Sequence, residues 1–402
     1  MSRLSLVITT SVFLTLLLTV GAFPQDDDME KEFFEGVAVM EEDYKSFKKA
    51  AFEEFQRDVK AMWGDFEVST KKDWVEYSGD KTGRSRVDFE TGKVLVEVVV
   101  PEEEVRKNPG ILEKKLTEEI KRLVVNKGKS RDYDVPSPAL EGKVIKKPLS
   151  QKEIPPETLL PEPVLEGQLR DKAGEEVTEK NKEEFAKETV KTKPVVKKEL
   201  ETEKGRMVKA QVTFNLVPHH LRIRAEKYLD TVRANASRFE ISVPLAFAVI
   251  HTESYFNPKA TSHAPAYGLM QLVPRSGARD AFRYVYGKDK LVPPEYLYEP
   301  DNNIELGCAY LGLLKAHYFD DIKSPESATY CMVASYNTGA GNLSRAICGE
   351  KRLKPAINKA NKITSEELYS HLMKNLPYKE TQDYLKRVTA RMSLYREWEQ
   401  VK

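Results

Sequence analysis

The hydrophobic periods of this chain predict two structurally different parts. Residues 86–89 and 93–100 alternate apolar and polar side chains, and Glu90-Thr91-Gly92 joins the two runs. This period of two is typical of β-strands, and the short link containing glycine predicts a hairpin. From His219 onward, apolar residues recur every three or four positions, which predicts helices. The expected fold class is therefore α+β, with a small mixed α/β N-terminal domain followed by a mainly α domain.

The N-terminal domain, expected at residues 23–217, should add helices and a closing strand to the hairpin. The helices are expected at residues 29–63, 111–125 and 181–189, and the strand at 210–216. Residues 134–163 are rich in proline, lysine and glutamate, which predicts a loop or an extended crossing segment. This domain carries no readable nucleophile constellation, metal-ligand spacing or glycine-rich phosphate loop.

The C-terminal domain, expected at residues 218–402, should contain five or more helices with short connections. Residues 221–239 carry the apolar stripe of a single first helix. Asp301 is a candidate N-cap of a later helix, Ser324 precedes another, and residues 384–395 mark a closing helix.

The charge balance argues against nucleic acid as a partner. Lys and Arg number 64 against 63 Asp and Glu, so the chain has no overall positive field to attract phosphates. Hydrophobic residues make up 40% of the 402 positions, which is enough for about two cores.

An apolar run at residues 4–23 predicts a signal peptide, residues 1–22, and hence an exported, periplasmic protein. The alternative is an uncleaved membrane anchor, because nearly 20 apolar residues just span a bilayer. The three cysteines, Cys308, Cys331 and Cys348, leave at least one thiol unpaired in an oxidising compartment, and a disulfide between two of them stays open.

One glutamate, Glu253, prolongs the apolar face of a predicted helix. Ser242 and Pro244 predict the start of this helix, and Asn257-Pro258 predicts its end. The same face carries Ala246, Val249 and Ile250. Burial penalises the charged form of a carboxyl, so a glutamate here could hold a proton and act as a general acid. The alternative is a solvated glutamate at a helix end.

The letters around Glu253 follow a pattern with fixed offsets. They are Glu253-Ser254, Phe256-Asn257-Pro258, Ala260, Ser262 and Gly268-Leu269-Met270-Gln271. This pattern resembles the catalytic motif of the soluble lytic transglycosylase family, whose members have a goose-lysozyme-like fold. A second segment at residues 334–341, ASYNTGAG, is similar to the family's A-Y-N-x-G signature, with Ser335 inserted.

The resemblance implies an enzyme that cleaves the β-1,4 bond between N-acetylmuramic acid and N-acetylglucosamine in peptidoglycan glycan strands, with no cofactor. Glu253 would be the sole catalytic carboxylate, acting as acid and then as base to leave a 1,6-anhydro-muramoyl end. Consistent with one carboxylate, no Asp or Glu lies between Glu253 and Asp280. A second acid from a distant segment, such as Glu295, Glu299 or Asp301, would instead give a lysozyme-type hydrolase. The remaining alternative is a non-catalytic cell-wall-binding scaffold.

The resemblance also implies five substrate-binding residues. Ser262 would lie near the reacting sugar and Gln271 would line the saccharide cleft. Tyr336 would stack and hydrogen-bond beside the acid, and Asn337 would hold the glutamate or an acetamido group. Tyr384 would point into the cleft. The alternatives are a loop-capping hydroxyl for Ser262 and buried aromatic packing for Tyr384.

The run at residues 212–221 resembles a membrane-bound branch of this family. Members of that branch are lipoproteins anchored through a cysteine after the signal peptide, whereas the first cysteine of this chain is Cys308. The sequence therefore gives no support for lipid anchoring. The N-terminal domain is expected to bind cell-wall or membrane-associated protein partners.

The histidines do not predict a metal site. His219-His220 and the pair of His251 and Glu253 lack metalloprotease spacing, since His251 lies about 200° around a helix from Glu253.

Overall fold

The computed structural model describes residues 50, 52–128, 162–260 and 266–399. The predicted signal peptide, the first part of the helix expected at 29–63 and nearly all of the segment 134–163 lie outside these residues. The sheet and the helices discussed below belong to one compact unit, residues 56–131 and 156–402. Within the described ranges, the helices are too short or too polar to cross a membrane.

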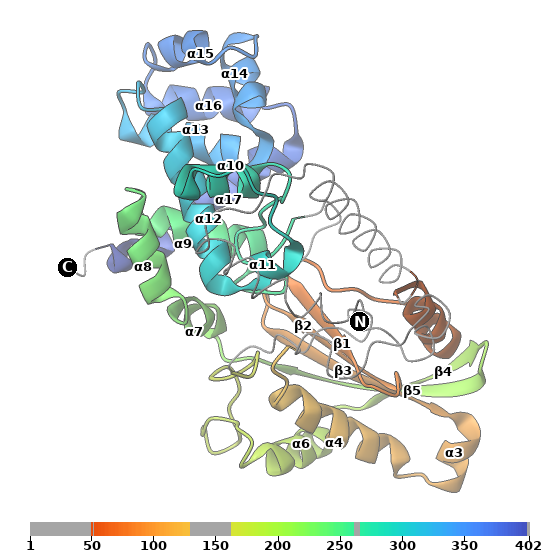
Figure 1. The fold of residues 1–402 in the computed structure, drawn as a ribbon. Coiled ribbons are helices and arrows are strands. Elements are labelled where there is room, and N and C mark those ends of the chain that lie inside the picture. Colours follow the sequence, from red (N-terminus) through yellow and green to blue (C-terminus); the bar gives the residue numbers. More distant parts are fainter. Residues whose placement is uncertain (1–49, 51, 129–161, 261–265, 400–402) are drawn as a thin grey trace, which may run out of the picture. The chain divides into compact units, whose positions relative to one another are not determined.

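The N-terminal part is built on a five-stranded antiparallel sheet with the order β1-β2-β3-β5-β4 (Figure 1). Its strands are β1 Asp73–Tyr77, β2 Gly83–Asp88, β3 Lys93–Pro101, β4 Val196–Thr202 and β5 Gly205–Asn215. The predicted hairpin is formed by β2 and β3, with Asp88 opposite Lys93 and Gly92 in the turn at φ 72°. Strand β3 then pairs with β5 from Lys93–Asn215 to Pro101–Met207, so distant segments form the middle of the sheet.

Helices α4 Ile111–Val124 and α6 Lys182–Thr192 lie on one side of the sheet (Figure 1), and their apolar residues share a buried core with those of the strands. The short α3 Glu102–Lys107 has no buried residue, and the chain is also helical at residues 52–63. The predicted stripe of α4 is buried with strand residues such as Val94 and Val96, and Phe185 of α6 meets Phe214 of β5 edge to face, with ring centroids 5.7 Å apart. The sequence missed α3 and β4 because neither carries a buried residue that could set a period.

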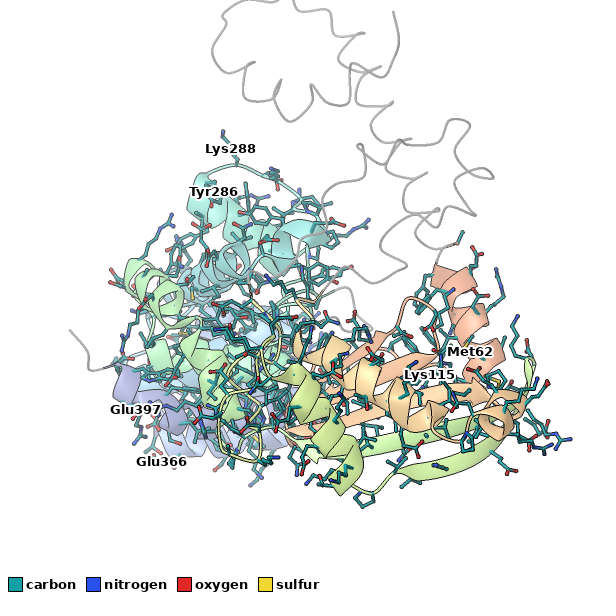
Figure 2. All side chains as sticks on the ribbon, turned by 90° about the horizontal axis from the view of Figure 1, so that it is seen from below. Met62, Lys115, Tyr286, Lys288, Glu366 and Glu397 are labelled. Atoms are coloured by element: carbon teal, nitrogen blue, oxygen red, sulfur yellow. The ribbon has the colours of Figure 1, made fainter. Side chains whose placement is uncertain are left out.

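The C-terminal part is helical around a second apolar core. Its helices are α7 His220–Glu226, α8 Leu229–Arg238, α9 Val243–Ser254, α10 Gly277–Tyr286, α11 Pro294–Tyr298, α12 Pro300–Leu313, α13 Pro325–Thr338, α14 Ala340–Cys348, α15 Leu353–Ala360, α16 Ser365–Asn375 and α17 Lys379–Met392. A π turn, Leu314–Tyr318, extends α12, and a 3-10 helix, Ser393–Trp398, follows α17. Glu397 lies on this 3-10 helix (Figure 2). It accepts a hydrogen bond from Arg222 of α7. The three cysteines are free thiols, so the disulfide left open by the sequence is not formed.

The single first helix predicted at residues 221–239 is wrong, because two helices occupy this stretch. Helix α7 ends at Glu226, and α8 begins at Leu229. The break lets α7 contact the sheet as well as the helical core. His220 of α7 contacts the carbonyl of Phe89 through Nε2, 3.0 Å away, whereas Ala225 of α7 and Val232 of α8 both lie in the helical core.

The predicted N-cap at Asp301 is also wrong. Helix α12 begins at Pro300 with Glu299 as its N-cap, and Asp301 lies in the first turn. Its carboxylate accepts a hydrogen bond from the Thr231 hydroxyl at 3.0 Å, which ties α12 to α8. Ser324, by contrast, caps α13 as predicted, by accepting from the backbone N–H of Ser327 at 3.2 Å.

Candidate active site

Glu253 lies in the last turn of α9, inside the protein. The Ser242 hydroxyl caps the start of this helix by accepting from the Leu245 N–H at 3.4 Å, with Pro244 in the first turn, as predicted. Every residue from Pro244 to Ser254 is buried, so the helix has no solvated face, and Glu253 itself is 4% exposed. A carboxylate buried to this extent needs a charged or hydrogen-bonding partner.

Helix α9 ends at Ser254, earlier than the predicted end at Asn257-Pro258. Tyr255 and Phe256 both adopt left-handed backbone, with φ of 50° and 61°, which is costly for residues other than glycine. The buried guanidinium of Arg224 holds this reversal by donating to the carbonyls of Tyr255 at 3.1 Å and Phe256 at 2.7 Å. The reversal places the Tyr255 side chain in the apolar core of the sheet, while Phe256 remains in the helical core.

A tight turn at residues 267–272 is fixed against α9 and α12. Asn303 of α12 is fully buried; its Oδ1 accepts from the Met270 N–H at 2.7 Å, and its Nδ2 donates to the carbonyls of Tyr267 at 2.9 Å and Leu297 at 2.7 Å. Gly268 has a φ of 76°, and a Cβ there would lie 2.1 Å from the Leu297 carbonyl oxygen. The Ser254 hydroxyl donates to the Leu269 carbonyl at 2.7 Å. The turn therefore has one position relative to Glu253.

Gln271 ends this turn with a buried side chain. Its Nε2 donates to the carbonyls of Ala260 at 2.9 Å and Gly268 at 3.0 Å. Its Oε1 is buried and has no hydrogen-bond partner among the described residues. The described contacts thus place Gln271 against the turn backbone and leave one acceptor unsatisfied.

Tyr336 of α13 and Tyr384 of α17 are electrostatic neighbours of Glu253. The Tyr336 hydroxyl donates to the Met270 carbonyl at 2.8 Å. Tyr384 is 2% exposed, and its hydroxyl lies close enough to Glu253 to interact but without the geometry of a hydrogen bond. Burial, and next the negative charge of Glu253, raise the pKa of both hydroxyls well above the usual value. Both side chains are therefore neutral hydroxyls at physiological pH.

Asn337 and Ser262 are placed differently from these tyrosines. The Asn337 Oδ1 accepts from the Thr381 hydroxyl at 2.7 Å, which joins α13 to α17. The hydrogen bonds described for Asn337 therefore lead to Thr381 and not to Glu253. Ser262 lies outside the described residues.

Lys71 contacts the Glu253 carboxylate, and our sequence analysis missed it. Its Nζ lies 2.9 Å from Glu253 Oε2, across 182 residues of sequence. Lys71 comes from the loop before β1, in the N-terminal part of the chain. The local sequence Thr70-Lys71-Lys72-Asp73 reads as an ordinary solvated loop, so no local signal could have identified it.

His251 is buried on α9 and serves the fold. Its Nδ1 lies 2.8 Å from the Tyr395 hydroxyl, which donates to it when the imidazole is neutral. Burial, and next the positive charges of Arg391 and His220, lower the pKa of His251 from 6.5 to about 3. The described residues contain no group of three or more His, Cys, Asp or Glu side chains that could hold a metal ion.

We expect His251→Gln to reduce the loss of stability at acidic pH. The folded protein holds His251 neutral, whereas the unfolded chain takes up a proton below 6.5. The contribution of neutral His251 to the free energy of unfolding is therefore fully present above pH 6.5 and is lost as the pH falls toward about 3. Between these limits the free energy of unfolding of the wild type should fall by about 2–4 kcal/mol because of this group. Urea unfolding at several pH values gives the free energy of unfolding as a function of pH. Equal slopes of this dependence in wild type and variant would contradict the role of His251.

Comparison with known proteins matches both parts of the chain. Residues 230–358 match the transglycosylase SLT domain, and residues 40–125 match the N-terminal domain of membrane-bound lytic murein transglycosylase C. A solved structure, the 70 kDa soluble lytic transglycosylase of Escherichia coli, is similar at 25% identity with a TM-score of 0.33. That similarity covers 44% of this chain and 25% of the chain in that structure.

Longer similarities link the chain to complete relatives. Membrane-bound lytic murein transglycosylase C of Salmonella arizonae is 31% identical over 346 residues, which cover 85% of this chain and 88% of the relative. The protein of the same name from Haemophilus ducreyi is 30% identical over 348 residues, covering 85% of both chains. These matches confirm the resemblance that the sequence motifs indicated. The chain belongs to the membrane-bound lytic murein transglycosylase C family.

Proposed function

We propose that this chain, a peptidoglycan lytic transglycosylase by its family, cleaves the β-1,4 bond between N-acetylmuramic acid and N-acetylglucosamine and leaves a 1,6-anhydro-muramoyl end. Glu253 acts first as the acid and then as the base. The observation that carries this proposal is the Glu253 carboxylate, buried at the end of α9 beside two neutral tyrosine hydroxyls and paired with a cation.

The nature of that partner favours a single-carboxylate mechanism. Ordinary glycosidases place a second carboxylate beside the first, as a nucleophile or to activate water. In the described part of the chain, the ion pair on Glu253 is made with Lys71. Asp301, one candidate for a second acid, instead accepts from Thr231 on the outside of α12.

The proposed reaction passes two protons through one carboxyl group, one given to the leaving oxygen and one taken from the muramoyl 6-hydroxyl. Protonated Glu253 gives its proton to the glycosidic oxygen while the bond from that oxygen to C1 breaks. The resulting carboxylate takes the proton of the muramoyl 6-hydroxyl as its oxygen bonds to C1. No water is consumed, and Glu253 ends protonated, ready for the next cleavage.

The orphaned polar atoms near Glu253 support roles in substrate binding. Gln271 Oε1 and the Tyr384 hydroxyl are buried without hydrogen-bond partners among the described residues, which is costly unless a ligand completes them. We assign both to saccharide binding, together with Tyr336. We also assign Asn337 and Ser262 to saccharide binding, because both match positions of the family motif.

The remaining proposals concern organisation and location. We place the domain boundary between residues 217 and 218, with a cleaved signal peptide at residues 1–22. The protein acts in the cell envelope, and we assign it to the periplasm. The N-terminal domain is proposed to bind the wall or wall-associated proteins.

Product analysis tests the reaction. Digestion of purified sacculi by the full chain should release muropeptides with 1,6-anhydro ends, one water lighter than hydrolysis products in mass spectrometry. Reducing ends would instead establish a lysozyme-type hydrolase. Binding to sacculi with no released product would establish a scaffold.

A further inference from the structure

The loop that carries Lys71 is held in place by the sheet. The Thr70 N–H donates to the Asp73 carbonyl at 2.9 Å, and the Thr70 hydroxyl donates to Asp73 Oδ2 at 2.8 Å. The Phe89 N–H donates to the Lys72 carbonyl at 2.9 Å, which ties the other end of the loop to the residue after β2. The backbone on both sides of Lys71 is therefore fixed.

A second set of contacts joins this loop to the residues that follow Glu253. Lys72 Nζ donates to Glu90 Oε2 at 2.8 Å, and the Tyr255 hydroxyl donates to Glu90 Oε1 at 3.0 Å. Arg391 of α17 donates to the same Tyr255 hydroxyl at 3.0 Å. Because Tyr255 lies two residues after Glu253, these contacts fix the position of the Lys71 loop relative to the Glu253 carboxylate.

Among the described residues, Lys71 makes the ion pair with the Glu253 carboxylate. The neutral hydroxyls of Tyr336 and Tyr384 also interact with Glu253, and the positive charge of Arg387 acts on Tyr384. Arg391 and Arg224 bind α9 and its end through backbone and hydroxyl oxygens. Lys71 is 36% exposed in its side chain and Glu253 is 5% exposed. A partly exposed ammonium thus pairs with a buried carboxylate.

The Lys71 ammonium lies 2.9 Å from Glu253 Oε2, so it makes an ion pair with the carboxylate form of this side chain. Glu253 is ionised in the middle of the proposed reaction, after it has given up its proton and before it takes one back. The ion pair thus stabilises the state that the first half of the reaction produces.

We propose that Lys71, supplied by the N-terminal part of the chain, is a positioning residue of the active site that pairs with the Glu253 carboxylate between its two proton transfers and holds it in place. This inference rests on the proposed function. It gives the N-terminal domain a part in catalysis itself, in addition to any role in binding the wall.

The test compares kcat and KM for the release of anhydro-muropeptides by the wild type and by Lys71→Met. Loss of the cation should lower kcat about two- to fivefold and leave KM near the wild-type value, because Lys71 contacts the carboxylate that transfers the protons and is itself partly exposed. Lys71→Arg retains a cation and should restore kcat.

Lys197→Met is the matched control, because Lys197 of β4 also pairs with a glutamate, Glu113 of α4, at 2.8 Å and takes no part in the contacts that hold the Lys71 loop. It should leave kcat at the wild-type value. A Lys71→Met kcat equal to that of the wild type, or an equal fall in Lys197→Met, would overturn the inference while wild-type anhydro products still support the proposed function. Reducing products from the wild type would overturn the proposed function instead.

Discussion

Glu253→Gln should slow the release of anhydro-muropeptides from sacculi about 10²- to 10⁴-fold, the range expected for loss of a positioned acid–base group. The carboxamide has nearly the same shape as the carboxyl but neither donates a proton as an acid nor accepts one as a base. Both halves of the proposed reaction therefore fail together. The measurement is the rate of product release by mass spectrometry, with binding to sacculi followed by co-sedimentation.

Glu226→Gln provides the control for this loss. Glu226 is an exposed glutamate of α7 that pairs with Arg222, so its replacement should leave the rate near that of the wild type. Glu253→Gln should still sediment with sacculi. Activity within tenfold of the wild type would show that another group is the acid.

Asn303→Ala should destabilise the fold by about 3–5 kcal/mol and remove most of the activity. The change leaves the Met270 N–H and the carbonyls of Tyr267 and Leu297 without the partner that now satisfies them. Each buried polar group that loses its partner costs about 1–3 kcal/mol. Urea unfolding measures the loss of stability. The rate of anhydro-muropeptide release shows whether displacement of the turn that carries Gln271 also reduces activity.

The adjacent asparagine offers a control on the same helix. Asn302 makes one long hydrogen bond, from Nδ2 to the Tyr296 carbonyl at 3.4 Å. Asn302→Ala should therefore change the free energy of unfolding by less than about 0.5–1 kcal/mol. Equal losses in both variants would show that the turn is not what Asn303 stabilises.

Local patterns predicted the elements that have a period or a cap. The hairpin of β2 and β3 followed from alternation and Gly92, and α4 from its apolar stripe. Ser242 predicted the start of α9 because a capping hydroxyl acts within one turn. The two classes of structure and their order along the chain were predicted correctly for the same reason.

Long-range pairing was beyond these patterns. Strand β4 is an exposed edge, and the break between α7 and α8 accompanies a contact of α7 with Phe89, which is distant in sequence. Lys71 reaches Glu253 only through the assembled sheet. At the candidate site, the motif identified Glu253, Tyr336 and Tyr384 as neighbours, but it could not show that Asn337 pairs with Thr381.

The reversal at Tyr255 and Phe256 makes the end of α9 depend on both hydrophobic cores. One of these rings is anchored in each core, so the helix end is complete only when both cores are formed. Partial unfolding of either core would therefore displace the last turn of α9, which holds the Glu253 carboxylate.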